Sequence, residues 1–361
     1  MNLLHLSDFH LGHKCYGIVR RQNALRKNFT EHHEGGLNWT IEQTNPDAVM
    51  VSGDLFDNSS PTYDDMDVLR NWIASVPCPV IGNTGNHEKL PDSFMQASEY
   101  FGIHKPGMYG DLKILCASHM YRSVLREYAK VVEDCDIMIL HQSMCGFLSS
   151  IMSPEIDQET ANLLSEKCSY LALGDLHIHN RMKINNCIAA YPGPIDFLRV
   201  GESHNKFGGW LVTETDGCIS SKSVEIKPYQ KTHIINIKTE EEYLDFHELV
   251  KECENDFLVV KAIEHPTLYA QTQLLLNNKR HDCEKFCFRL DEVEIEDSES
   301  SRELEDGSNF TDDDFISIVR KDKTIEEDDK KLAADLWNNK TVKGMQALLA
   351  QDLKEEKERE S

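Results

Sequence analysis

Six short apolar runs in the first half of the chain share one pattern, in which β-branched and other apolar residues lead into a Gly or a polar residue. The runs are NLLHLS, DAVMVSG, CPVIGN, KILCAS, DIMILH and SYLALG. Their length and composition are typical of buried β-strands. Helical patterns lie between several of them, including residues 63–76 and 93–101. Because buried strands that alternate with helices build layered sheets, residues 1–228 predict an α/β domain whose functional loops follow the strands.

The pattern changes after a predicted hairpin whose turn is Asp216-Gly217. Residues 229–295 contain three further strand-like runs (THIINIK, FLVVKAIE and KFCFRLDEVEI) separated by helical segments, which predicts a small α+β domain. Residues 296–315 are acidic and Ser-rich, a composition typical of a linker. Residues 316–361 predict a helical tail, because the capping box TIEE precedes apolar positions at helical spacing.

The charge of the chain limits the classes of protein that it can represent. The net charge is −24, and residues 291–361 carry 23 acidic and 11 basic residues, a net charge of −12. Generic nucleic-acid-binding proteins are usually basic. An acidic chain that holds phosphates therefore needs another source of positive charge, such as bound divalent cations.

The sequence predicts neither a membrane protein nor a secreted one. No apolar run approaches the roughly 20 residues of a membrane span. The N-terminal segment is strand-like and lacks the layout of a signal peptide. The eleven cysteines include no CxxC pair, so we expect reduced thiols and a cytoplasmic protein.

Residue types that bind metals follow the predicted strands. They are Asp8 and His10 in SDFHLG, Asp54 and Asp57 in GDLFD, Asn86 and His87 in GNHE, His141 in LHQ, and Asp175 and His177 in LGDLHIH. Each motif alone is commonly a solvated turn or a packed histidine. Together, in this order and each at the end of a strand, they predict a metal site, because carboxylates and imidazoles are ligands for divalent ions.

The set of motifs resembles that of the calcineurin-like metallophosphoesterases. In chain order, the motifs are D-x-H, GD-x-x-D, GNHE, a lone His and a G-x-x-H loop. The runs SDFHLG, GDLFD and YPGP (191–194) narrow the resemblance to SbcD-type nuclease subunits, the bacterial and phage relatives of the meiotic-recombination double-strand-break repair nuclease. The resemblance covers residues 1–228 and extends to the rest only in layout. It implies a four-layer α/β sandwich, a small α+β capping domain that binds DNA, and a helical C-terminal tail that binds a partner.

The resemblance also implies roles for the site residues. It gives two metal shells that share Asp54, one completed by Asp8, His10 and His177 and the other by Asn86, His141 and Asp175. His87 then protonates or stabilises the leaving 3′ oxygen, and Asp57 orients a ligand. Mixed oxygen and imidazole ligands suit Mn²⁺. Two such ions hold a phosphodiester and activate the hydroxide that attacks it.

The LGDLHIH motif allows two ligand pairs. Most relatives have GHxH where this chain has Gly174-Asp175-Leu176-His177. Because Gly174 directly follows the buried run YLAL, we favour Asp175 and His177, which leaves His179 at the surface or facing DNA. The alternative pair is His177 and His179.

The resemblance predicts an Mn²⁺-dependent DNA exo- or endonuclease that acts in recombination, repair or replication on duplex ends, single strands or hairpins. A phosphoprotein phosphatase of the same superfamily is an alternative, but such enzymes carry an Arg after GDxxD, where this chain has Asn58. A catalytically silent DNA-end-binding scaffold is a third possibility, against which the full set of ligands argues.

The same resemblance implies partners. The family acts with a coiled-coil ATPase, SbcC, and this chain has no GxxxxGK[ST] motif, so any ATP dependence would come from such a partner. It also implies a homodimer formed through helices 63–76 and 93–101, and a bacterial cell or a phage-infected host as the setting.

The basic run RRQNALRK (20–27) is expected either to contact phosphates or to form a solvated helix face. No role is expected for His13, His104 and His119.

Overall fold

The computed structural model describes residues 1–14, 19–88, 101–148, 153–199, 206–237, 239, 241–242, 244–246, 256–263 and 287–290. The chain divides into two compact units, Met1–Glu294 and Ile295–Ser361. All described residues belong to the first unit. The predicted linker and helical tail lie outside the described residues, as does almost all of the predicted helix at 93–101.

Five strands form a first mixed sheet in the spatial order β11-β10-β1-β2-β3. Their bounds are β1 Asn2–Leu6, β2 Ala48–Ser52, β3 Val80–Asn83, β10 Gly208–Thr215 and β11 Cys218–Glu225. Strands β1, β2 and β3 are parallel, and β10 and β11 form the predicted hairpin. Asp216 and Gly217 have positive φ angles of 52° and 77°. Two such residues in a row are what a tight two-residue hairpin turn requires, so the predicted hairpin is confirmed.

Six strands form a second mixed sheet in the order β4-β5-β6-β7-β9-β8. Their bounds are β4 Gly107–Tyr109, β5 Leu112–Ala117, β6 Ile137–His141, β7 Tyr170–Gly174, β8 Asn180–Ile184 and β9 Cys187–Tyr191. The four inner strands are parallel, and the edge strands β4 and β8 are antiparallel to their neighbours. All six apolar runs of the sequence are therefore strands of these two sheets, which confirms the α/β class.

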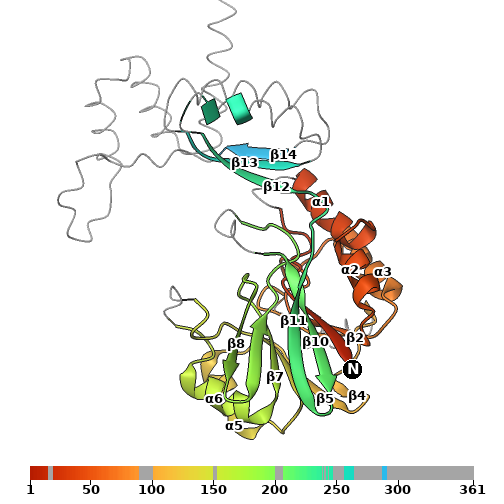
Figure 1. Ribbon diagram of the computed structural model, residues 1–361, viewed down its shortest axis with the longest axis vertical. Coiled ribbons are helices and arrows are strands. Elements are labelled where there is room, and N and C mark those ends of the chain that lie inside the picture. Colours follow the sequence, from red (N-terminus) through yellow and green to blue (C-terminus); the bar gives the residue numbers. More distant parts are fainter. Residues whose placement is uncertain are drawn as a thin grey trace, which may run out of the picture. The chain divides into compact units, whose positions relative to one another are not determined.

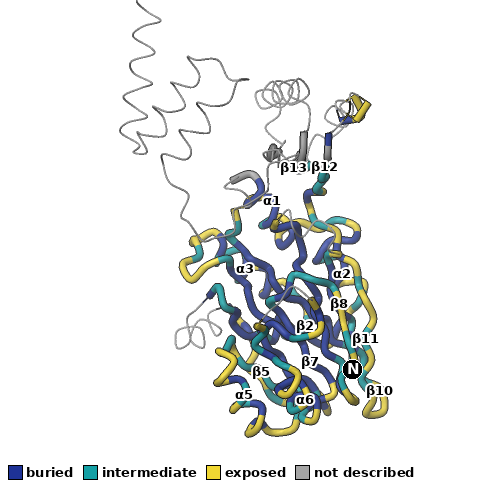
Figure 2. The backbone as a smooth tube through the Cα atoms, turned by 90° about the vertical axis from the view of Figure 1, so that its left-hand side faces the viewer, coloured by how far each residue is buried: buried dark blue, intermediate teal, exposed yellow. Residues whose placement is uncertain are grey.

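Helices cover the outer face of each sheet, and the two sheets share an apolar core between them (Figure 1). The helices on the first sheet are α1 Val19–Thr30, α2 Leu37–Thr44 and α3 Tyr63–Ser75, and those on the second are α5 Arg122–Val131 and α6 Gln158–Lys167. Trp72 of α3 packs on the first sheet and Leu164 of α6 on the second. The inner strands β2, β6 and β7 are thus buried on both faces (Figure 2). This burial explains why their sequences read as continuous apolar runs.

The basic run at 20–27 lies in α1, but two of its arginines are directed into the protein. Arg21 is 2% exposed, and its guanidinium pairs with the buried carboxylate of Asp196. Arg26 donates from Nε to Asp65 Oδ1 at 2.8 Å, which ties α1 to α3. The expectation of phosphate contacts or a solvated face is therefore wrong for Arg21 and Arg26.

A separate parallel sheet contains β12 Thr232–Ile237, β13 Phe257–Ile263 and β14 Cys287–Leu290. These strands coincide with the three runs predicted for the α+β region. Phe257 and Val259 pack with Phe197, which follows β9 in the chain. The helical segments predicted between these strands lie mostly outside the described residues. Among the helices that are described, none is long and apolar enough to cross a bilayer.

Candidate metal centre

The carboxyl ends of the parallel strands bring the predicted site residues together. The loops after β1 and β2 run side by side, because the His10 N–H donates to the Asp54 carbonyl at 2.9 Å. The loop after β7 joins them, because the Asp175 N–H donates to Asp8 Oδ1 at 3.1 Å. Both sheets therefore contribute to one site, as expected at the carboxyl ends of parallel strands.

Three overlapping groups of side chains have ligand atoms within 4.8 Å of one another. The groups are Asp8–His10–His177, His10–Asp54–His87 and Asp8–Asp54–His141. Asp54 Oδ2 lies 3.4 Å from His10 Nε2 and 3.3 Å from His141 Nε2. This carboxylate oxygen thus lies close to histidines from both sheets.

His141 and Asn86 present unsatisfied buried atoms to the cluster. The Nδ1 of His141 donates to the Ser52 carbonyl at 2.7 Å, which directs Nε2 toward Asp54. Asn86 Nδ2 donates to Asp175 Oδ1 at 3.2 Å. Among the described residues, His141 Nε2 and Asn86 Oδ1 are both buried without a hydrogen-bond partner. An unsatisfied buried atom such as Asn86 Oδ1 costs about 1–3 kcal/mol. A divalent cation would satisfy it and would accept the lone pair of His141 Nε2, so these residues fit a metal centre.

The backbone of the site is strained. Seven non-glycine residues of the described chain have positive φ angles, and four of them are predicted ligands: Asp8 at 55°, His10 at 45°, Asp54 at 49° and Asp175 at 99°. Each such conformation costs on the order of 1–3 kcal/mol and persists only where the surrounding structure enforces it. The backbone strain is thus concentrated at four residues with carboxylate or imidazole side chains, which indicates a functional constraint.

Two glycines of the motifs leave room for the ligands. A Cβ atom on Gly85 would lie 1.9 Å from Asp54 Oδ1, and one on Gly174 would lie 1.9 Å from the Ser52 carbonyl oxygen. Both distances are far below van der Waals contact. The Gly of GNHE and the Gly of LGDLHIH are therefore required by the packing of neighbouring motifs.

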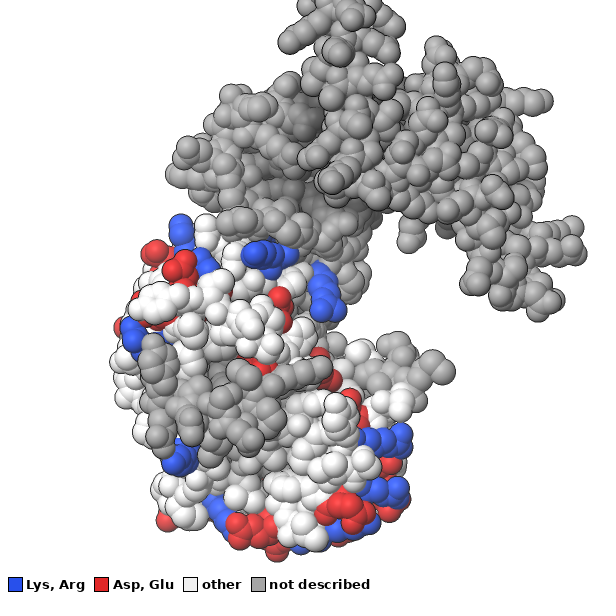
Figure 3. Space-filling view, turned by 180° about the vertical axis from the view of Figure 1, so that it is seen from behind, with Lys and Arg blue, Asp and Glu red and all other residues white. Residues whose placement is uncertain are grey.

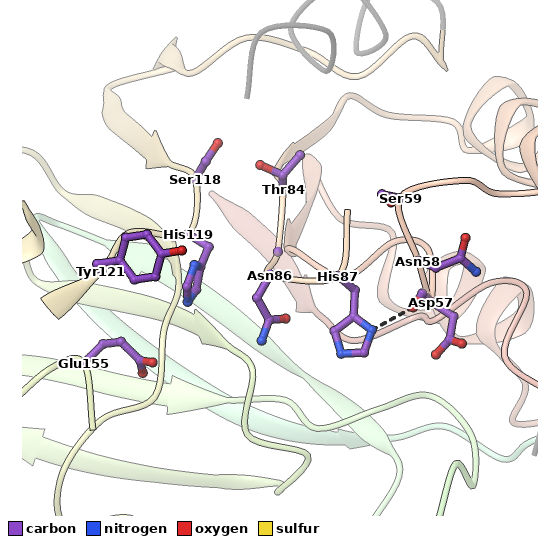
Figure 4. A pocket seen from close by; sticks show the side chains of 11 residues that line it. Asp57, Asn58, Ser59, Thr84, Asn86, His87, Ser118, His119, Tyr121 and Glu155 are labelled. Carbon is purple, nitrogen blue, oxygen red and sulfur yellow. Dashed lines mark hydrogen bonds between the residues drawn. The ribbon is translucent and has the colours of Figure 1, made fainter. Parts of the chain in front are cut away.

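His87 and Asp57 lie beside the cluster at the edge of a cavity (Figure 4). The Nδ1 of His87 donates to the Asp57 carbonyl at 2.7 Å, so its Nε2 faces the cluster, 4.0 Å from Asp54 Oδ2. The carboxylate of Asp57 lies 3.4 Å from His10 Nδ1. Asp57 thus orients His87 through its backbone and contacts His10 through its side chain.

His179 lies away from the cluster. Its Nδ1 donates to the Pro192 carbonyl at 2.8 Å, and its Nε2 lies 2.6 Å from Ser223 Oγ. Its ring stacks on Trp210, with the centroids 4.4 Å apart. This geometry favours Asp175 and His177 over the alternative pair His177 and His179.

The structure adds residues to the site that the sequence analysis did not assign. Glu88 is 2% exposed and accepts from the Phe56 N–H at 2.9 Å and the Gly85 N–H at 2.6 Å, so it braces two ligand loops. Its place in the GNHE motif is the one sequence signal that points to it. His13 Nδ1 lies 2.9 Å from Asp57 Oδ1, and its Nε2 donates to the Leu198 carbonyl at 3.1 Å.

His119 also belongs to the site, because it lines the cavity, whereas His104 is exposed on the surface. No local pattern marks His13 or His119, since their neighbours in the site come from distant parts of the chain. The expectation that His104 has no role stays a prediction.

Charge coupling within the site shifts several pKa values. Burial by itself lowers the pKa of His141, but the negative charge of Asp54 outweighs it and raises that pKa to about 10. Burial would raise the pKa of Asp54, yet His141 holds it below its ordinary value. Burial, reinforced by Asp54, raises the pKa of Glu88 to about 7. Burial also raises the pKa of Asp175 to about 6, against the opposing effect of His141. A cation that binds His141 must therefore displace a proton.

The cavity beside the cluster has a volume of about 760 Å³. One wall contains Asp57, Asn58, Ser59 and His87, the opposite wall contains Ser118, His119, Tyr121 and Glu155, and Thr84, Gly85 and Asn86 lie between them (Figure 4). The residues that line it in the described part of the chain include neither Lys nor Arg. A phosphate in this cavity would therefore rely on bound cations for its charge partners.

Comparison with known proteins agrees with this geometry. Residues 1–143 match the calcineurin-like phosphoesterase family. The DNA double-strand break repair protein Mre11 of Methanopyrus kandleri is 22% identical over 285 residues, which cover 66% of this chain and 60% of that protein. Mre11 of Methanosarcina mazei is 28% identical over 54% of this chain and 33% of its own length. Mre11 of Methanococcus maripaludis is 23% identical over 81% of this chain and 78% of its own length.

With its strand ends that carry carboxylates and histidines and with the family match of residues 1–143, the chain is similar to the calcineurin-like phosphoesterases. Within that class, the chain is a distant relative of the Mre11 double-strand break repair proteins, at 22–28% identity. The resemblance inferred from the motifs is thereby confirmed. The chain spans 60% and 33% of the length of the first two of these relatives.

Proposed function

We propose that this protein is a DNA nuclease subunit that hydrolyses phosphodiesters with two divalent ions, preferably Mn²⁺. The observation that carries the proposal is the position of Asp54 Oδ2, which lies 3.4 Å from His10 Nε2 and 3.3 Å from His141 Nε2. A carboxylate that lies between ligands of two shells is suited to bridge two cations. Bound cations would supply Lewis acidity toward the phosphate and a nucleophile at neutral pH.

The protein's own side chains hold the centre and move a proton. Asp8, His10 and His177 would hold one cation, Asn86, His141 and Asp175 would hold the other, and Asp54 would contribute to both shells. His87 directs Nε2 toward the cluster from a partly exposed position, because the Asp57 carbonyl accepts from Nδ1 at 2.7 Å. A proton on Nε2 can therefore pass to the leaving 3′ oxygen. Asp175, where the family motif that this chain resembles has His, would add an oxygen ligand and favour hard cations such as Mn²⁺.

The charge distribution supports a substrate held mainly at the metal centre. On the face seen in Figure 3, acidic and basic side chains of the described residues are interspersed. The net charge of −24 opposes binding to a phosphate backbone over a large area. Asn58 and Thr84 line the cavity, and the lining contains no Arg or Lys among the described residues, which counts against a phosphatase that clamps a phosphomonoester.

The proposal extends to assembly. The names of the relatives, DNA double-strand break repair proteins, support a role in repair or recombination. The cytoplasm of a bacterium or of a phage-infected host is the setting that the motif resemblance implies. We infer that the three-stranded region caps the DNA, that a coiled-coil SbcC-like ATPase binds residues 316–361, and that helix α3 contributes to a homodimer. Tyr63, at the start of α3, is 68% exposed and so is open to a second copy.

Purified protein with Mn²⁺, assayed on end-labelled duplex, hairpin and single-stranded DNA and on a phosphopeptide, tests the proposal. We expect release of nucleotides from DNA and none of this activity in Asp54→Asn. Phosphate release from the phosphopeptide without DNA cleavage would establish the phosphatase alternative. DNA binding without hydrolysis in Mn²⁺, Mg²⁺, Fe²⁺ or Zn²⁺, with or without the ATPase, would establish the scaffold alternative.

A further inference from the structure

One wall of the cavity takes no part in the chemistry described above. It comprises Ser118, His119, Tyr121 and Glu155, and is called the aromatic wall below. The His119 ring centroid lies 6.5 Å from that of His141 and 6.3 Å from that of Tyr121. The three rings thus lead from the buried cluster to the mouth of the cavity, opposite His87 (Figure 4).

Tyr121 occupies a position that its local structure does not explain. It is the N-cap residue of α5, yet its side chain makes no capping hydrogen bond. Ser, Thr, Asp and Asn are preferred at this position because their side chains do cap. The Tyr121 side chain is instead 78% exposed at the cavity mouth. A large ring that neither caps a helix nor packs in the core is available to contact a ligand.

The chemistry of the aromatic wall selects among possible ligands. Glu155 Oε2 accepts from the Ser143 N–H at 3.0 Å and also from the Ser143 hydroxyl, which holds the carboxylate at the wall. A fixed carboxylate repels a phosphate, and the described residues of the lining include no Lys or Arg that would offset this repulsion. The same group accepts from ring N–H and amino donors, and the aromatic rings offer a stacking surface. A nucleobase has both properties.

We propose that the aromatic wall is a nucleobase subsite, in which a base adjoining the scissile phosphate leaves its stack and lies against Tyr121. This inference rests on the proposed nuclease function and specifies the substrate of the same site. An aromatic ring can stack on any base, because every base has a flat π-face. The subsite therefore favours an unpaired nucleotide at the cleaved position, as in single strands, hairpins and frayed ends, with little dependence on sequence.

The test compares intact and abasic substrates. Single-stranded oligonucleotides with one cleavable phosphodiester, and otherwise methylphosphonate linkages, carry either a normal base or an abasic residue on the 5′ or the 3′ side of that bond. For the wild-type protein, we expect removal of the base on one side to lower kcat/KM roughly tenfold, the size typical of one base–aromatic stack. Tyr121→Ala should lower kcat/KM by a similar factor on the intact substrate and cause no further loss on the abasic one.

Matched variants separate stacking from a structural role. Tyr121→Phe and Tyr121→Trp keep an aromatic ring and should stay within about twofold of wild type. Val131→Ala removes another exposed apolar side chain, 80% exposed at the far end of α5, and should have no effect. The proposal is overturned if Tyr121→Ala matches wild type on the intact substrate, or if it loses the same factor on both substrates. A wild-type protein that cleaves none of these substrates would instead overturn the proposed nuclease function.

Discussion

The Nε2 atom of His141 lies 3.3 Å from Oδ2 of Asp54, and the two side chains are 0% and 2% exposed. His141 ends a strand of the second sheet, and Asp54 follows a strand of the first. The Ser52 carbonyl, at 2.7 Å from Nδ1, holds the histidine in this orientation. Both side chains are therefore held in place, and metal binding at them would require little rearrangement.

Asp54→Asn should remove metal binding while preserving the shape of the side chain. The amide loses the negative charge that faces His10 and His141, so hydrolysis should fall by more than the roughly 10–100-fold typical of losing an outer partner. The measurement is the rise in Tm caused by Mn²⁺, which should be present in wild type and absent in the variant. Asp64→Asn, at a carboxylate that is 75% exposed, is the control. An unchanged Mn²⁺-induced shift in Asp54→Asn would contradict the assignment of Asp54 as the bridging ligand.

Gly85→Ala should disable the site through a residue that binds no metal. Its new methyl group would lie 1.9 Å from Asp54 Oδ1, so the carboxylate or the loop must move. We expect at least a tenfold loss of Mn²⁺ affinity by calorimetry, the lower bound for a disturbed ligand environment. Gly107→Ala introduces a methyl group with nothing within 4 Å and should bind Mn²⁺ as wild type does. Equal Mn²⁺ affinities in the two variants would contradict this prediction and show that the Asp54 loop can move without disturbing the site.

His87→Gln should separate catalysis from metal binding. The Gln side chain can still donate to the Asp57 carbonyl but has no titratable nitrogen to protonate the leaving oxygen. We expect kcat to fall by about 10²–10⁴-fold, the usual contribution of a general acid. The number of Mn²⁺ ions bound, measured by equilibrium dialysis, should stay as in wild type. Loss of an ion in this variant would identify His87 as a ligand instead.

His5 should make the folded protein sensitive to acid. Its Nε2 lies 2.6 Å from Ser52 Oγ and its Nδ1 lies 3.0 Å from the Tyr170 hydroxyl, in the fully buried space between the sheets. Burial, with a smaller effect of His179, lowers the pKa of His5 to about 3. Below its ordinary pKa of about 6.5, the unfolded chain binds a proton that the folded chain does not. The free energy of unfolding should therefore decrease as the pH falls from about 6.5 toward 3, by about 1.4 kcal/mol per pH unit from this residue.

Urea unfolding of the metal-free protein at pH 4, 5, 6 and 7 measures this effect. His5→Gln keeps polar contacts with Ser52 and Tyr170 but cannot take up the proton, so its stability should depend less steeply on pH. His32→Gln, at a histidine whose side chain is 54% exposed, should keep the wild-type slope. Parallel slopes for wild type and His5→Gln would show that His5 does not contribute to acid unfolding.

Much of the fold could be predicted because local patterns encode it. The inner strands lie between two layers and must be apolar on both faces, so β2 (Ala48–Ser52) and β6 (Ile137–His141) read as continuous apolar runs. The edge strands β4 (Gly107–Tyr109) and β8 (Asn180–Ile184) are short or partly exposed, and no such run marked them. The burial of Arg21 in α1 could not be predicted in this way. Its basic neighbours suggested a solvated helix face, whereas the structure buries Arg21 against Asp196.

The sequence by itself determined the order of the motifs, the strand that precedes each of them, and the residue types suited to bind divalent ions. Only the tertiary structure decided which polar groups meet. Ser52 and His141 are 89 residues apart, and His13 and Leu198 are 185 apart, yet each pair is hydrogen-bonded. The roles of Glu88 and His13 and the placement of Tyr121 at the cavity mouth follow from such long-range packing. The physical reason is that periodicity reports the environment of each strand alone, whereas a site depends on how strand ends from two sheets come together.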